Sequence, residues 1–171
     1  MEMLCVLAVI IILAAATLPS ISSFYGNSRQ KAGVDLFRAR LADARALAME
    51  TGTNYRIAIS EDGTKIRVAP DGQDFATAPA ATQPSFGAKV MESEFDKKVT
   101  AEVWADADDP PPLIDQGWVT VATFLTDGTC KEDTVVVRVK EGDFPPMRVL
   151  VRGVTGGSRT LPASSTLGGG P

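Results

Sequence analysis

The sequence predicts an α+β fold in which a long N-terminal helix packs on an antiparallel β-sheet. An apolar run followed by helically spaced apolar residues predicts the helix, and alternating apolar and polar segments from residue 55 onward predict the strands. Strands that follow a helix suit an α+β domain better than a βαβ unit. We expect a hydrophobic helix at 1–24, its amphipathic continuation at 25–53, a β-rich domain at 54–155 and a disordered tail at 156–171.

The first segment is almost wholly apolar. Residues 3–18 read MLCVLAVIIILAAATL, and as a helix this run would be about 24 Å long, compared with about 30 Å for the hydrocarbon core of a bilayer. Its length lies between that of a signal-peptide core and that of a full membrane span. A cleaved signal peptide begins with basic residues, whereas this chain has the acidic Glu2 there. A retained helical anchor is therefore the favoured interpretation.

Two residues in this first segment are unusual. A carboxylate such as Glu2 costs about 2.5–3.5 kcal/mol if it is carried to the centre of a bilayer. It therefore needs a partner, unless it lies at the water interface. Pro19 lacks an amide hydrogen and clashes with the preceding helical turn, so it predicts a kink or a weak stretch over residues 19–26.

The helical pattern resumes after this stretch. Apolar residues recur at intervals of three and four and predict one buried helix face, which comprises Val34, Phe37, Leu41, Ala44 and Ala48. Gly52 provides a C-terminal stop. We therefore expect one helix from about Met3 to Glu50.

Alternating residues predict about six strands in the remainder of the chain. Turn residues at 61–64 and 127–128 separate some of these strands, and a proline-rich stretch at 106–112 interrupts the pattern. The expected strands lie at 55–60, 66–68, 99–103, 118–125, 134–139 and 147–151.

The composition argues against catalysis. The absence of histidine excludes Ser-His-Asp and Cys-His mechanisms and histidine-bound zinc, and we expect neither an enzyme nor a cofactor. The net charge of −4 argues against a broad nucleic-acid footprint. Cys5, in the apolar helix, and Cys130, in a turn, are not expected to pair. One acidic cluster could bind calcium, although a solvated loop is favoured: Asp106, Asp108, Asp109 and Asp115.

The N-terminal segment, with Glu2 and Pro19 at their observed spacing, resembles the first helix of type IV pilins and type II secretion pseudopilins. The pattern RARLADARALAMETG within residues 32–53 looks like the minor pseudopilin branch of the GspH/FimT type. The segments FLTDGT and RVLVRGVTGG near the C-terminus are similar to the closing strands of that branch. The resemblance is most specific over about the first 50 residues.

This resemblance implies a structural subunit anchored in the bacterial inner membrane by a single pass, with its C-terminal domain in the periplasm. Its partners would be other pseudopilins, which contact it through the N-terminal helix, and a prepilin peptidase that also methylates the new N-terminus. Glu2 would pair with the free terminal amine of a neighbouring subunit, and the stretch around Pro19 would let the helix bend. The implied function is protein secretion through a periplasmic pseudopilus.

Two alternatives to this function stay open. A FimT-like minor pilin would bind DNA for uptake through basic residues near the C-terminus, here Arg148, Arg152 and Arg159. Because the chain lacks the paired arginines that such binding would need, nucleic acid is not the expected partner. The other alternative is a generic membrane-anchored periplasmic binding domain.

The chain departs from the family pattern in two ways. The family's basic leader, which ends in glycine before the apolar helix, is not seen, so we expect the true start of the protein to lie upstream and Met1 to be internal. Basic residues follow the anchor, and by the positive-inside rule alone they would place the domain in the cytoplasm. These residues are Arg29, Lys31, Arg38 and Arg40. A basic leader upstream would remove the conflict.

Overall fold

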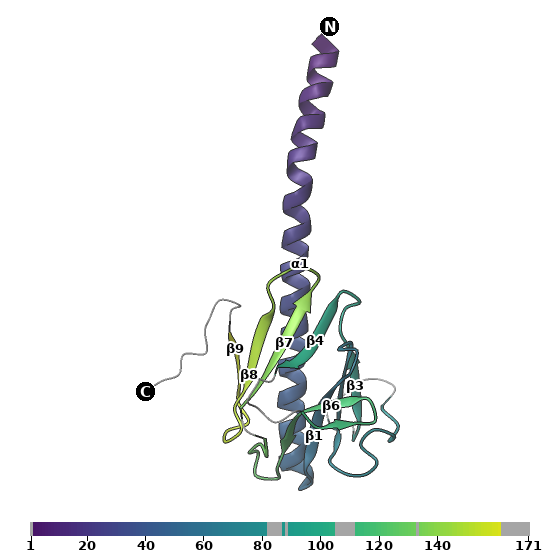
Figure 1. The fold of residues 1–171 in the computed structure, drawn as a ribbon, viewed down its shortest axis with the longest axis vertical. Helices are drawn as coiled ribbons and strands as arrows, with labels where there is room; N and C mark the ends of the chain where they lie inside the picture. Colours follow the sequence, from purple (N-terminus) through teal and green to yellow (C-terminus); the bar gives the residue numbers. More distant parts are fainter. Residues whose placement is uncertain (1, 82–86, 88, 105–111, 133, 162–171) are drawn as a thin grey trace, which may run out of the picture.

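The computed structural model describes residues 2–81, 87, 89–104, 112–132 and 134–161. Before residue 27 it describes the helix backbone and the side chains of Met3, Val6, Leu7 and Ile10 only. In Figure 1 the N-terminal part of the helix extends beyond the β-domain as one rod, and the strands gather along its C-terminal part.

One helix, α1, runs from Glu2 to Thr51, which confirms the predicted long helix. The backbone stays helical through Pro19, so the helix does not end at residues 19–26. A proline removes one hydrogen bond from a helix but need not end it. Gly52, with φ +64°, terminates the helix as predicted, because this left-handed conformation turns the chain away at little cost for glycine.

The strands form two antiparallel sheets, whereas the sequence suggested one. The first sheet has the order β3-β2-β1-β6-β5, and the second has the order β4-β7-β8-β9. The first comprises β1 (Tyr55–Ser60), β2 (Lys65–Pro70), β3 (Met91–Glu94), β5 (Ile114–Asp115) and β6 (Trp118–Phe124). The second comprises β4 (Val99–Trp104), β7 (Val135–Glu141), β8 (Met147–Val151) and β9 (Ser158–Leu161).

The six expected strands are all present, and the short strands β3, β5 and β9 were not predicted. The expectation of a disordered tail at 156–171 is wrong for Ser158–Leu161, because β9 pairs with β8 in register, with Leu150 opposite Arg159. The ladder hydrogen bonds hold a segment whose composition alone would not order it. Residues 162–171 lie outside the described part of the chain.

The predicted apolar face of α1 forms the centre of the core. Phe37 and Ala44 are completely buried, and Leu41 is 2% exposed. The helix contacts strands of both sheets, and both contribute to one apolar cluster, for example Ile57 from β1 and Val137 from β7. The helix thus joins the two sheets into one domain and confirms the predicted α+β arrangement.

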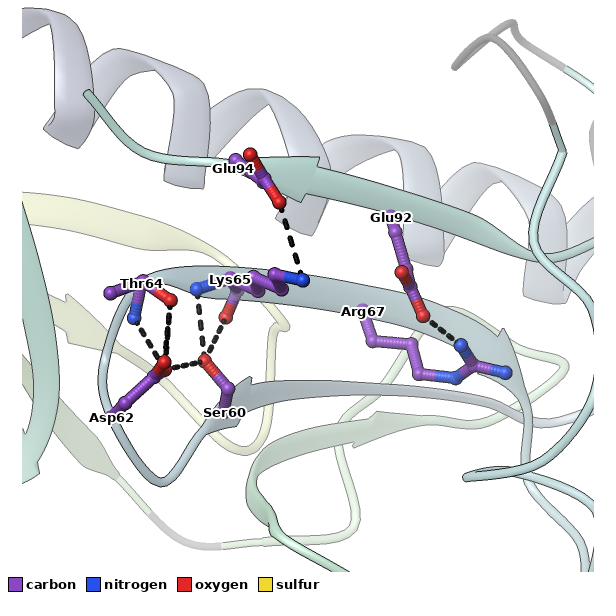
Figure 2. A network of polar contacts seen from close by, with 7 residues as sticks. All are labelled: Ser60, Asp62, Thr64, Lys65, Arg67, Glu92 and Glu94. Atoms are coloured by element: carbon purple, nitrogen blue, oxygen red, sulfur yellow. Dashed lines mark hydrogen bonds and ion pairs between the residues drawn. The ribbon is translucent and has the colours of Figure 1, made fainter. Parts of the chain in front are cut away.

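The turn between β1 and β2 also links the sheets. Gly63 has φ +73°, and its carbonyl accepts a hydrogen bond of 2.9 Å from the amide of Ala101 in β4. A Cβ atom at Gly63 would lie 2.5 Å from the carbonyl oxygen of Ala101, so the close approach requires glycine. Figure 2 shows that Ser60 and Thr64 donate hydrogen bonds to Asp62 in this turn. These bonds lower the pKa of Asp62 to about 2.

Candidate functional site

The N-terminal half of α1 leaves large apolar side chains uncovered. Met3 is 85% exposed, and Val6, Leu7 and Ile10 are each 58–60% exposed. Exposed apolar side chains are stabilised when lipid or another apolar surface covers them. This half is therefore the part of the molecule that most clearly needs a partner.

Glu2 and Pro19 both belong to this projecting half of α1. Seventeen helical steps separate them, which corresponds to about 25 Å along the axis. The Glu2 and Pro19 side chains lie outside the described part of the structure, so the predicted pairing of Glu2 stays a prediction. Over the residues that the structure describes, no helix has both the length and the apolarity needed to cross a membrane.

A polar clamp fastens α1 to the domain near the start of its packed half. The buried amide of Gln30 donates hydrogen bonds to the carbonyls of Val139 in β7 (2.8 Å) and of Pro145 in the β7–β8 connection (2.9 Å). Arg29 adds an ion pair of 3.7 Å with the buried Glu141. Sequence reasoning missed Gln30, although it lies four residues before Val34 in the same helical spacing. The sequence signal for this contact is the single amide side chain of Gln30 on an otherwise apolar helix face.

The structure brings together two of the three arginines considered for DNA binding. Arg148 of β8 and Arg159 of β9 lie on the face of the second sheet that points away from α1, because their neighbours Val149 and Val151 are buried in the core. Arg138 of β7 is directly opposite Arg148 in the register, which the sequence did not reveal. Arg152 follows the end of β8 and is exposed.

Apolar and acidic side chains are interleaved with these arginines. Leu150 is opposite Arg159, and Glu102 is opposite Arg138. The Arg138 guanidinium stacks on the Trp104 ring. The face is therefore mixed in character, and its cations are partly engaged.

The structure does not assemble the acidic cluster considered for calcium. Asp115 of β5 forms an ion pair of 3.1 Å with the buried Arg56, so its carboxylate stabilises the first sheet. Asp106, Asp108 and Asp109 lie outside the described residues. Within the described ranges, no group of three or more potential ligands could hold a metal ion.

Cys130 is half-buried, and its thiol donates a hydrogen bond of 3.3 Å to the carboxylate of Glu132. Burial and the charge of Glu132 raise the pKa of the thiol to about 11. The thiol is therefore neutral near pH 7 and poorly nucleophilic.

A long N-terminal helix that packs along antiparallel sheets through its C-terminal half defines a pilin-like α+β fold. The minor pseudopilin EpsH from the type II secretion system of Vibrio cholerae has a similar structure (TM-score 0.56, 15% identity, 81% of this chain and 97% of that chain covered). The type IV minor pilin FimU of Pseudomonas aeruginosa is also similar (TM-score 0.57, 14% identity, 81% and 92% covered). No protein-family model and no curated protein matches the sequence. These similarities confirm the fold that the N-terminal resemblance implied.

Proposed function

We propose that the chain is a structural, non-catalytic minor pilin-like subunit of a bacterial type II secretion or type IV pilus-type assembly. One observation carries the proposal: in a pilin-like fold, the domain buries one half of α1 while the other half projects with Met3, Val6, Leu7 and Ile10 uncovered. An apolar helix without a covering domain is suited to a bilayer before assembly and to a bundle of similar helices afterwards.

The proposed location follows from this division of the helix. The projecting half holds the subunit in the inner membrane as a single pass, and the β-domain lies in the periplasm. On assembly, the same half packs with the helices of other pilin-like subunits. Glu2 then pairs with the terminal amine of a neighbour, because a carboxylate in an apolar bundle is tolerable only when paired. Breaking a buried pair costs about 3–5 kcal/mol, so the pair would fix the register between subunits.

The proposed maturation step provides the first test. We propose that a prepilin peptidase removes a leader immediately before the apolar helix and methylates the new N-terminus. Intact-mass and peptide mass spectrometry of the chain from its host membrane should find a methylated residue directly before Glu2. Cleavage near Ala16 would contradict the proposal and favour a secreted binding domain.

The finer proposal is a role in protein secretion through a periplasmic pseudopilus. One of the two similar structures belongs to a secretion system and the other to a type IV pilus, so a comparison of phenotypes is needed. A host lacking the chain should retain substrates of its type II system in the periplasm and keep its surface pili. Normal secretion together with lost pili would contradict the secretion role and leave the pilin-like assembly role standing.

DNA binding is a second candidate because Arg138, Arg148 and Arg159 share one sheet face. The interleaved Leu150 and Glu102 weigh against it, since a phosphate-binding surface concentrates free cations. The purified chain should therefore show no tight, salt-dependent binding to duplex DNA. Binding that weakens steeply with salt and is lost in the Arg148→Gln/Arg159→Gln variant would favour the DNA-uptake role.

A further inference from the structure

An open groove of about 260 Å³ lies between the outer surface of α1 and the loop that joins β8 to β9. Arg38, Ala42, Arg45 and Met49 line it on the helix side, and Gly156 and Ser158 line it on the loop side. Arg38 and Arg45 are seven residues apart, so both lie on the same face of the helix, about 10 Å apart along the axis. No acidic residue lines the groove.

Two glycines shape the surroundings of the groove. Gly128 has φ +81°, and a Cβ atom there would lie 2.8 Å from Sδ of Met49 and 3.1 Å from Nε of Arg45. Gly156 has φ +60°, and a Cβ atom there would lie 2.9 Å from the carbonyl oxygen of Gly128. The loop at Gly128 therefore approaches Met49 and Arg45 of α1 as bare backbone, and the loop at Gly156 packs closely on the Gly128 backbone.

Arg45 lacks an acceptor at this position. Its Nε atom is buried without a hydrogen-bond partner, and within the described ranges its guanidinium forms no hydrogen bond or ion pair. A buried donor without an acceptor is unfavourable. By contrast, the buried Arg56 is fully engaged and forms ion pairs with Asp71 and Asp115. The groove thus holds a positioned cation whose natural partner is a carboxylate.

We propose that this groove receives a carboxylate-bearing segment of a neighbouring pilin-like subunit. This proposal rests on the proposed assembly function, because bundling of the projecting half of α1 brings neighbouring domains beside its packed half. The incoming carboxylate accepts hydrogen bonds from the Arg45 guanidinium, and Arg38 supplies a second positive charge two turns away. The small side chain of Ala42 leaves room for a backbone to approach, and the half-exposed Met49 provides an apolar contact.

Charge complementarity supports an acidic subunit as the occupant. This chain has a net charge of −4 and a pI of about 4.9, yet two arginines and no acidic residue line the groove. A subunit of similar composition would therefore present carboxylates to the groove of its neighbour. Burial of the groove in the assembly would give Arg45 the acceptor that it lacks in the single chain.

Photo-crosslinking in the full chain tests the occupant directly. A benzophenone amino acid at position 42 should crosslink to a pilin-like subunit in host membranes, at an acidic peptide identified by mass spectrometry. In the Arg38→Gln/Arg45→Met background the yield should fall at least tenfold, whereas Lys31→Gln, a neutralised cation on the same helix outside the groove, should leave it unchanged. An unchanged yield in the double variant would overturn the proposal, as would crosslinks formed only within the chain.

Thermal unfolding of the detergent-solubilised full chain separates docking from a structural role for Arg45. Arg45→Met keeps the aliphatic stem and removes the unpartnered donors, so the Tm of the isolated chain should not fall. The matched variant Arg56→Met removes a buried arginine that has partners, and its Tm should fall. An equal fall in both variants would show that Arg45 stabilises the single chain and would overturn the proposal.

A crosslinker at position 7 distinguishes failure of this inference from failure of the proposed function. Crosslinks from position 7 to pilin-like subunits, with none from position 42, would overturn the docking groove and leave the assembly function standing. An absence of pilin-like partners at both positions would overturn both.

Discussion

The two halves of α1 show how one helix can serve two different surroundings. Between Val34 and Ala48, one apolar face of the helix packs on the sheets, and Val34, Phe37 and Leu41 are at most 2% exposed. Near the N-terminus, Met3, Val6, Leu7 and Ile10 are all more than half exposed. The backbone is continuous between the halves, so the difference lies in what covers the side chains and not in the secondary structure.

The two halves of α1 differ in what stabilises them. The packed half is stabilised by its own domain, since burial of apolar area contributes about 25 cal/mol per Å². The projecting half has no such cover within the described structure. Substitutions in the packed half should therefore change the unfolding of the isolated chain, and substitutions in the projecting half should change assembly instead.

Among these substitutions, Phe37→Ala in the packed half should cause the largest loss in the free energy of unfolding. Phe37 is completely buried, and loss of a buried phenylalanine typically costs about 3–5 kcal/mol through lost burial and the cavity that remains. Denaturant unfolding of the detergent-solubilised full chain measures this cost. Leu7→Ala is the matched change in the projecting half and should leave the free energy of unfolding within about 0.5 kcal/mol of wild type. Equal losses in both variants would refute the distinction.

Gly63→Ala should weaken the link between the sheets that the packed half joins. The φ of +73° disfavours alanine by about 1–2 kcal/mol. The contact of the new Cβ with the carbonyl of Ala101 adds a further cost, for a total of about 2–4 kcal/mol. Gly72→Ala is the control, because a Cβ atom there meets nothing within 4 Å. Similar unfolding curves for the two variants would contradict the proposed close approach.

Gln30→Leu should weaken the contact between the N-terminal end of the packed half of α1 and the β-domain. The substitution leaves the carbonyls of Val139 and Pro145 without their donor, which costs about 1–3 kcal/mol. Hydrogen exchange should rise in the α1 segment from residue 27 to 34 and remain unchanged near residue 48. Uniform exchange along the packed half would indicate that the clamp does not define where the helix leaves the domain.

The smallest expected effect concerns the reactivity of the thiol of Cys130. The raised pKa of Cys130, about 11, keeps its thiol protonated at pH 8. In a Cys5→Ser variant, where Cys130 is the remaining cysteine, the rate of maleimide labelling at pH 8 should be roughly two orders of magnitude lower than that of a free thiol. The rate should increase as the pH rises toward 11. Glu132→Gln removes the neighbouring charge, lowers the pKa and should accelerate labelling. Fast labelling of the parent at pH 8 would show that the thiol is not held neutral.

The sequence predicted the features that depend on local spacing. The intervals of three and four from Val34 to Ala48 marked the helix face that is in fact buried, and the turn at Gly63 marked the first hairpin. The division into two sheets was not predictable, because β4 pairs with β7 across a long stretch of chain. Strand β9 was missed because its residues SRTL are ordered by the ladder with β8 and not by their own composition.

The candidate site was predicted less completely than the fold. The resemblance singled out Glu2 and Pro19, which lie in the projecting half, but a pairing between subunits leaves no trace in a single chain. The unpartnered Arg45 could not be recognised from the sequence, because an arginine on a helix is usually solvated. Its Nε is buried in the folded chain, where the backbone at Gly128 approaches it.

Incorporation of a Glu2→Val variant into filaments tests the central claim most directly. The variant should insert into the host membrane at wild-type abundance, since valine is more apolar than glutamate, and its crosslinking from position 7 to other pilin-like subunits should fall at least tenfold. Glu50→Ala, which removes an exposed carboxylate at the other end of the same helix, should be incorporated normally. Wild-type incorporation of the Glu2→Val variant would contradict the account of α1 as an assembly helix held in register by this charge.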